Sequence, residues 1–167
     1  MADDALPAST RVAIVGGGAV GCAVAWALTR EGISDVVLIE KAQVTHGSTW
    51  HAAGLVGQYR SREDLTRLMQ SSVALMDEIE AETPIGWRRV GSLRLASSPA
   101  RMREYVEAAP RAKSYGVGFD LIGASDAKSL FPYIDTGGVE GAAFVHGDGY
   151  VDPTSLTQAY ARLARRG

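Results

Sequence analysis

The sequence predicts an α/β fold that opens with a strand–helix–strand unit, and three observations support this prediction. The β-branched apolar run "RVAIV" (11–15) is followed at once by glycines, as expected for a buried strand that ends in a tight turn. The run "AVGCAVAWALTREG" then keeps helical spacing until Gly32, which supplies a C-terminal stop. "DVVLIE" (35–40) has the length and composition of a second buried strand.

The glycines after the first strand have the spacing of a dinucleotide-binding turn. Gly16, Gly18 and Gly21 form G-x-G-x-x-G, and Glu40 ends the second strand. In a Rossmann-like unit these glycines permit the tight turn, the approach of a pyrophosphate and close helix packing, and the phosphates lie at the helix N-terminus. The acid accepts hydrogen bonds from ribose hydroxyls. We therefore predict an adenine dinucleotide site, although this motif alone does not separate NAD from FAD.

Composition excludes several other classes of protein. The 167 residues are 46% hydrophobic and 22% charged, with a net charge of −2, which is typical of a globular chain. Because no basic field is present, we expect no nucleic-acid partner. The uncharged run 12–28 has the length of a membrane span, but its three consecutive glycines favour a strand, a turn and a helix.

The single cysteine and the N-terminus predict the compartment. Cys22 lies in a run of small apolar residues, where a buried and inert thiol is expected, and it cannot form an internal disulfide. Residues 1–10 are acidic and lack the features of a signal or transit peptide, so they are expected to be a flexible lead-in. We therefore expect a reducing compartment and a cytoplasmic protein with no membrane span.

The stretch "GSTWHAAGL" (47–55) is the second candidate site. It is predicted to be a loop that enters a short helical turn, with Ser48 and Thr49 capping that turn and offering hydroxyls and N–H groups to a pyrophosphate. Small residues around Ala53 and Gly54 let the backbone approach a flat ring. Taken alone, His51 is more simply a surface or core histidine, and His46 is expected in an exposed loop. Trp50 either covers a cofactor or packs in the core.

Three stretches carry a resemblance to a known family. "VVLIEK", "GSTWHAAGL" and "GDGYVDPTSLTQA" resemble the N-terminal part of FAD-dependent oxidoreductases of the D-amino-acid oxidase type, most of all the dimethylglycine and sarcosine dehydrogenase branch. The resemblance runs from Arg11 to Gly167. It implies FAD, with His51 joined through a ring nitrogen to the 8α-methyl carbon of the flavin. The implied cofactor-binding residues are Gly16, Gly18, Val20, Gly21, Glu40, Lys41, Ser48, Thr49, His51, Ala53, Gly54 and Leu55.

The resemblance also implies the chemistry. Oxidation of the C–N bond of an N-methylated amino acid such as dimethylglycine or sarcosine would deliver hydride to flavin N5. Neutral imidazole, the dominant form near pH 7, suits attachment to an electrophilic carbon. The substrate is then a small amine, and an electron-acceptor protein or tetrahydrofolate is an implied partner of a longer chain. The alternatives are a non-catalytic regulatory relative, an inactive truncated chain and an NAD module, against which "GSTWHAAGL" argues.

The rest of the chain predicts the start of an interleaved α+β substrate-side region. A helix over 62–82 should place Leu65, Leu68, Met69, Met76 and Ile79 in the core. Strands are expected within 87–97, bent at Gly91, and at 117–122 and 137–145. Helices are expected over 98–116, capped by Ser98 and broken or kinked at Pro110, and over 125–132.

The last segment predicts a helix that returns to the dinucleotide unit. Asp148 and Gly149 are expected to form a turn, and Thr154 or Ser155 to cap the helix after Pro153. The expected organisation is 1–10 flexible, 11–61 the first portion of the FAD-binding domain, 62–145 the substrate-side region and 146–167 the returning helix. The domain is expected to be incomplete, because a further strand should follow.

Overall fold

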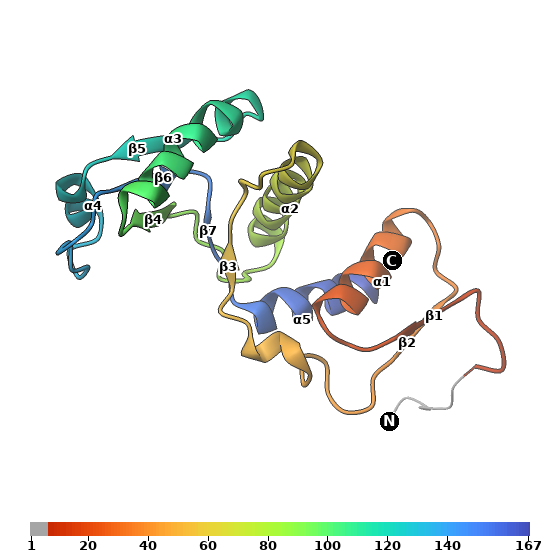
Figure 1. The fold of residues 1–167 in the computed structure, drawn as a ribbon. Coiled ribbons are helices and arrows are strands. Elements are labelled where there is room, and N and C mark those ends of the chain that lie inside the picture. Colours follow the sequence, from red (N-terminus) through yellow and green to blue (C-terminus); the bar gives the residue numbers. More distant parts are fainter. Residues whose placement is uncertain (1–6) are drawn as a thin grey trace. The chain divides into compact units, whose positions relative to one another are not determined.

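The computed structural model describes residues 7–167, which form two compact units built from discontinuous segments of the chain. Unit 1 contains the chain up to Gly54, together with Thr83–Gly86 and Asp152–Gly167. Unit 2 contains Leu55–Glu82 and Trp87–Val151. Helices and strands occur in both units (Figure 1), which confirms the mixed α/β class predicted from the sequence.

Unit 1 combines two parallel strands with two helices that pack against each other. Its elements are β1 (Val12–Val15), α1 (Ala19–Arg30), β2 (Val36–Ile39), the short 3₁₀ helix η1 (Ser48–His51) and α5 (Pro153–Ala164). β1 and β2 pair in parallel because α1 crosses between them. Figure 1 shows α5 beside α1, although most of the chain separates the two helices in sequence.

The helices cover one face of this strand pair. Val36 and Leu38 of β2 line a cavity together with Cys22 of α1, so this face lies under the helices. Val15 and Ile39 pair with each other across the two strands and are 86% and 39% exposed. The prediction that both strands are buried is therefore wrong for the face that carries Val15 and Ile39, because burial alternates along β1 with the period of two that a half-covered strand has.

The core of unit 1 lies between α1 and α5. Ala25 and Trp26 of α1 and Ala159 and Tyr160 of α5 are all buried. The rings of Trp26 and Tyr160 lie 5.4 Å apart between centroids. Burying an apolar side chain of this size stabilises a fold by about 1.5–3 kcal/mol, so this contact fixes the returning helix on α1.

The returning helix is capped by a residue that the sequence analysis did not assign. The Asp152 carboxylate accepts hydrogen bonds from the N–H groups of Thr154 (3.1 Å) and Ser155 (3.2 Å), and Pro153 occupies the first helical position. The predicted cap at Thr154 or Ser155 is therefore wrong. The hydroxyl of Ser155 instead donates to Asp152 at 2.6 Å, and this bond chiefly lowers the pKa of Asp152.

Unit 2 contains two antiparallel strand groups and three helices among its described residues. In chain order its elements are β3 (Leu55–Val56), α2 (Glu63–Glu82), β4 (Ser92–Ala96), α3 (Pro99–Ser114), β5 (Phe119–Ile122), α4 (Ala124–Leu130), β6 (Gly141–Val145) and β7 (Gly149–Tyr150). The strand order is β4-β6-β5 in one sheet, while β3 pairs with β7. Ala108 and Ala112 of α3 pack in one buried cluster with Phe119, Ala143 and Val145 of the sheet.

Helix α2 has the predicted length but a different buried face. Val73 and Ile79 are 3% and 1% exposed, whereas Leu65 and Leu68 are 43% and 58% exposed. The prediction that Leu65 and Leu68 enter the core is therefore wrong. In the first turns of α2 the buried residue is Thr66. Its hydroxyl can be buried there because it donates a hydrogen bond to the carbonyl of Arg60 at 3.1 Å.

Three local predictions in unit 2 have mixed outcomes. Ser98 caps α3 by accepting from the N–H of Arg101 at 3.2 Å, which confirms that prediction. Pro110 lies inside α3 and does not break it, since the helix continues to Ser114. The predicted turn at Asp148 and Gly149 is wrong, because the turn lies at residues 146–147 and Gly149 pairs with Val56 in the β3–β7 ladder.

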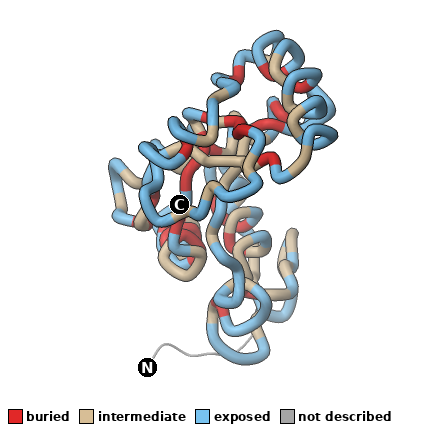
Figure 2. Tube along the Cα trace, turned by 60° about the vertical axis from the view of Figure 1, so that its left-hand side comes forward, coloured by how far each residue is buried: buried red, intermediate tan, exposed pale blue. Residues whose placement is uncertain are grey.

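Burial is discontinuous along the chain. Buried positions form short stretches separated by half-buried and exposed ones (Figure 2).

Over residues 7–167, no helix combines the length and the apolar character that crossing a membrane requires.

Candidate functional site

The glycine turn between β1 and α1 has a shape that other residues do not adopt. Gly16 has φ +107°, outside the regions open to L side chains, and its N–H donates to the carbonyl of Ile39 at 2.8 Å. A Cβ at Gly21 would overlap the carbonyl oxygen of Gly16. The helix therefore starts directly against the turn, as the G-x-G-x-x-G spacing requires.

The carboxylate of Glu40 is fixed at the end of β2. Its Oε2 accepts a hydrogen bond from the N–H of Gly17 at 2.7 Å, and its Oε1 accepts one from the N–H of Ala42 at 3.0 Å. These backbone bonds, Gly17 first, lower the pKa of Glu40. Glu40 is therefore a carboxylate at neutral pH and lies beside the turn. Lys41, the next residue, is exposed.

Thr49 caps a helix to which it does not belong. The N-cap of α1 is Gly18, which has no side chain to accept a bond. The N–H of Ala19 in the first turn donates instead to Oγ1 of Thr49 at 3.1 Å. The prediction that Ser48 and Thr49 cap their own turn is wrong, because the N-cap of η1 is Gly47 with no side-chain bond. This bond joins the stretch "GSTWHAAGL" to the glycine turn.

His51 is an exposed residue that stacks on its neighbour. The rings of Trp50 and His51 lie 3.7 Å apart between centroids and are inclined by 33°. The indole Nε1 of Trp50 donates to the carbonyl of His46 at 3.2 Å, and Trp50 is 57% exposed. Core packing of Trp50 is therefore ruled out within this structure. His46 is exposed, as predicted.

The other predicted site residues are mostly exposed. Val20 in the first turn of α1 is 79% exposed, and Ser48 and Ala53 are also exposed. Gly54 has φ +72° and ends the unit 1 segment. Leu55 opens β3 in unit 2 and is 82% exposed. Hydrogen bonds thus join the glycine turn to Glu40 and the first turn of α1 to Thr49, while these remaining residues lie along the same stretches of sequence.

One residue of the site, Thr45, was missed by the sequence analysis. It has φ +79°, the only positive φ of a non-glycine residue between positions 7 and 167, and it is buried. Its N–H donates to the carbonyl of Gly17 at 3.0 Å. Neither glycine nor asparagine marks this position, so the sequence held no signal for it.

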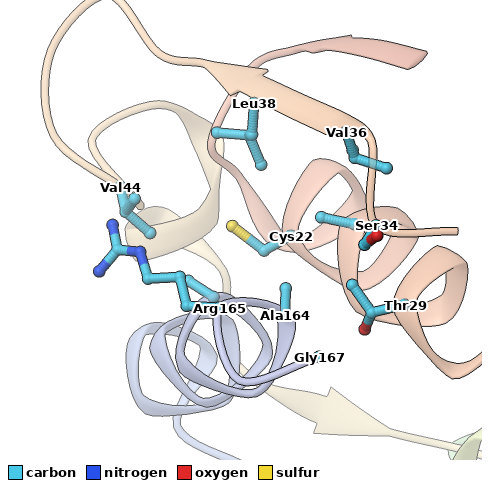
Figure 3. A pocket seen from close by; sticks show the side chains of 11 residues that line it. Cys22, Thr29, Ser34, Val36, Leu38, Val44, Ala164, Arg165 and Gly167 are labelled. Carbon is cyan, nitrogen blue, oxygen red and sulfur yellow. The ribbon is translucent and has the colours of Figure 1, made fainter. Parts of the chain in front are cut away.

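A cavity of about 420 Å³ lies elsewhere in unit 1, between α1, β2 and α5 (Figure 3). Its lining includes Cys22, Thr29, Leu38 and Arg165 but no residue of the glycine turn. Cys22 is fully buried, as predicted, and burial raises the pKa of its thiol, with Arg165 opposing this. The cavity is thus separate from the glycine turn, and its thiol is held in the less reactive protonated form.

His146 and Asp148 do not form a pair. The Nε2 of His146 lies 2.6 Å from Oδ2 of Asp120, and both side chains are more than half exposed. Asp148 is buried and accepts hydrogen bonds from the N–H of Gln58 and the hydroxyl of Ser92, both at 2.7 Å. The two residues therefore belong to different interactions: His146 pairs with Asp120, whereas Asp148 is held by Gln58 and Ser92.

The glycine turn fits a dinucleotide on three structural grounds. The turn carries no side chains that would block a phosphate, the first turn of α1 has no acidic residue to repel one, and a carboxylate lies beside the turn at the end of β2. This combination is the dinucleotide-binding form of a βαβ unit.

Comparison with known proteins defines the family more closely. The family model for FAD dependent oxidoreductases matches residues 11–167. The chain therefore belongs to the family of FAD dependent oxidoreductases, which confirms the family resemblance found in the sequence.

The most similar relatives include two human enzymes. Human dimethylglycine dehydrogenase is 37% identical over 155 residues, and human sarcosine dehydrogenase is 33% identical over 162 residues. These alignments cover 92% and 95% of this chain but 18% of each relative. Among solved structures, L-proline dehydrogenase from P. horikoshii superposes with a TM-score of 0.92 at 28% identity, over 96% of this chain and 43% of that one.

Proposed function

We propose that this chain provides the FAD-binding region of a flavoprotein that oxidises the C–N bond of N-methylated amino acids such as dimethylglycine or sarcosine. The observation that carries the proposal is the hydrogen bond between Ala19 and Thr49, which joins the glycine turn to "GSTWHAAGL". This second stretch is also part of the resemblance to FAD-dependent oxidoreductases, and it therefore argues against an NAD module. The names of the two human relatives support the substrate class.

Each residue of the site has a proposed part in holding FAD. The backbone of the glycine turn and the N-terminus of α1 would bind the pyrophosphate, and Glu40 would accept hydrogen bonds from the ribose hydroxyls. Val15 and Val20 flank the turn and are 86% and 79% exposed, so they offer apolar surface for the cofactor to cover. The bound flavin supplies the acceptor for a hydride from the carbon next to the amine nitrogen.

We also propose that His51 holds the flavin covalently, through a bond between a ring nitrogen and the 8α-methyl carbon. His51 is exposed on η1, so its ring is accessible. The bond replaces an N–H bond of His51 and one C–H bond of the methyl group. The two protons and two electrons released would pass to the oxidised flavin ring, which would be reduced by the attachment.

Attachment and turnover can be tested separately. The purified protein is precipitated in acid, and the pellet is examined for flavin fluorescence that stays with the polypeptide. We expect retained fluorescence in the wild type and in His46→Ala, and its loss in His51→Ala. Retained fluorescence in His51→Ala would refute the attachment site.

Turnover is tested without air by adding dimethylglycine or sarcosine and following the loss of the yellow flavin absorbance. Bleaching by either amine supports the proposed reaction. Bound flavin that neither amine reduces would instead favour a non-catalytic regulatory protein. Tight binding of NAD with no FAD would overturn the cofactor assignment itself.

Two finer points belong to the same proposal. A protein that accepts electrons, or tetrahydrofolate that accepts the one-carbon unit, would serve as a partner of the complete enzyme. We propose a cytoplasmic location, with which the free, buried Cys22 is compatible, whereas both human relatives are mitochondrial by name. Cell fractionation with antibodies against the protein decides between the two compartments.

A further inference from the structure

The chain between β2 and η1 contains a tight turn with an unusual residue in it. The N–H of His46 donates to the carbonyl of Gln43 at 3.0 Å and closes a four-residue turn. Thr45 is the third residue of this turn and has φ +79°. This is the position at which a type II turn requires a positive φ and at which glycine or asparagine is usual. A β-branched residue there is strained.

The strained residue contacts the glycine turn directly. The N–H of Thr45 donates to the carbonyl of Gly17 at 3.0 Å, and Thr45 is 8% exposed. On its other side, the N–H of Gly17 donates to Glu40 at 2.7 Å. Both polar groups of Gly17 are therefore held by the segment that follows β2.

Fixing the carbonyl of Gly17 also fixes the next N–H group. The described peptide bonds are all trans, and in a trans peptide the carbonyl and the following N–H point in opposite directions. The bond from Thr45 therefore turns the N–H of Gly18 away from the 43–46 turn. Gly18 is the N-cap of α1, at the positive end of the helix dipole.

We infer that Thr45 is a positioning residue of the dinucleotide site: its left-handed backbone conformation aims its N–H at Gly17 and presents the Gly18 N–H to the cofactor phosphate. Strained residues persist where the surrounding structure holds them, and they gather at functional sites. The inference rests on the proposed FAD site, but it concerns the order of the glycine turn and not the amine reaction.

The test separates the N–H group of Thr45 from its side chain. Thr45→Gly and Thr45→Asn keep the N–H and tolerate a positive φ, whereas Thr45→Pro has no N–H and fixes a negative φ. All variants carry His51→Ala, so that FAD can exchange, and the dissociation constant of FAD is measured by quenching of its fluorescence.

We expect Thr45→Gly and Thr45→Asn to bind FAD within about 3-fold of the Thr45 parent, and Thr45→Pro to bind about 30-fold more weakly, because one buried hydrogen bond is lost. Equal affinity in Thr45→Pro would overturn the inference. So would a loss in Thr45→Gly as large as that in Thr45→Pro.

A second measurement does not depend on the folding of the proline variant. Hydrogen–deuterium exchange of the peptide that contains Thr45 is followed with and without FAD, using the parent and Thr45→Gly. We expect FAD to slow exchange in both proteins. An unchanged rate would contradict the inference. Covalent attachment is measured by acid precipitation and amine oxidation by bleaching of the flavin. Failure of the proposed function would change those two results, whereas failure of this inference would change only the effect of the Thr45 variants on FAD binding and exchange.

Discussion

Oγ1 of Thr49 accepts a hydrogen bond from the N–H of Ala19 at 3.1 Å, across thirty positions of sequence. The first turn of α1 lacks a capping side chain of its own, because its N-cap is Gly18. A Cβ at this position would lie 3.1 Å from the same hydroxyl, so any larger residue would crowd this hydrogen bond. The stretch that contains His51 is thereby fastened to the helix N-terminus that would bind the phosphates of FAD.

Replacing Thr49 with valine should weaken both the helix start and cofactor binding. Loss of a capping hydroxyl costs about 1 kcal/mol, which corresponds to roughly 5-fold in the FAD dissociation constant if the bond is needed for binding. The measurement is FAD titration in a His51→Ala background. Thr49→Ser keeps the hydroxyl and serves as the matched control. Equal binding by the valine and serine variants would contradict the prediction.

The pH dependence of FAD binding should follow Glu40. The backbone N–H groups of Gly17 and Ala42 lower the pKa of Glu40. Because of this lowered pKa, Glu40 stays a carboxylate in the folded protein through the ordinary glutamate range and is protonated only at lower pH, where it can no longer accept hydrogen bonds with both oxygens. FAD binding should therefore be constant near neutral pH and should weaken only in acid, as titrations at a series of pH values will report.

The control for this experiment is a glutamate outside the site. Glu40→Gln places an amide against two backbone donors and should lower affinity at neutral pH while removing the acid-dependent step. Glu107 is an exposed residue of α3, so Glu107→Gln should keep the wild-type profile. An acid-dependent step that persists in Glu40→Gln would show that another group is responsible.

Gly21→Ala should disturb the contact between α1 and the glycine turn. The added Cβ would overlap the carbonyl oxygen of Gly16, and backbone cannot move aside as a flexible side chain can. Overpacking of this kind costs about 1–3 kcal/mol. Thermal unfolding measures the loss. In Gly47→Ala the added Cβ has no neighbour within 4 Å, so this control should unfold near the wild-type temperature.

The parts of the site that the sequence predicts are those in which neighbouring residues set the geometry. Gly16, Gly21 and Glu40 were identified because strand, turn, helix and acid follow one another along the chain. The bond from Ala19 to Thr49 spans thirty positions, and spacing within one element does not encode it. Thr45 was missed because its positive φ is imposed by surrounding contacts, while turn preferences favour glycine there.

In the fold, too, the sequence predicts what neighbouring residues determine and not what distant contacts determine. The spacing of α2 predicts a helix correctly, but which side of it is buried depends on its partners. Leu65 and Leu68 are exposed, whereas Thr66 is buried through its bonds to the chain that enters the helix. Periodicity thus predicts that an element forms more reliably than it predicts the face that is covered.

Asp148 should be the most sensitive polar residue of unit 2. It is 1% exposed, accepts from the N–H of Gln58 and the hydroxyl of Ser92, and lies 3.5 Å from a guanidinium nitrogen of Arg94. Asp148→Ala would leave all three donors without this acceptor. A buried donor without a partner costs about 1–3 kcal/mol, so we expect a total loss of about 2–4 kcal/mol in the free energy of unfolding.

Denaturant unfolding measures this loss of stability. Hydrogen exchange of the peptide that contains β3 gives a local measurement, because Gln58 lies two residues beyond that strand. Asp148→Asn keeps one acceptor oxygen and should lose less stability than Asp148→Ala. Asp120→Ala is the matched control, since Asp120 is 61% exposed in its pair with His146 and such a pair contributes at most about 1 kcal/mol. A similar loss in Asp120→Ala and Asp148→Ala would mean that burial of Asp148 adds nothing to its effect on stability.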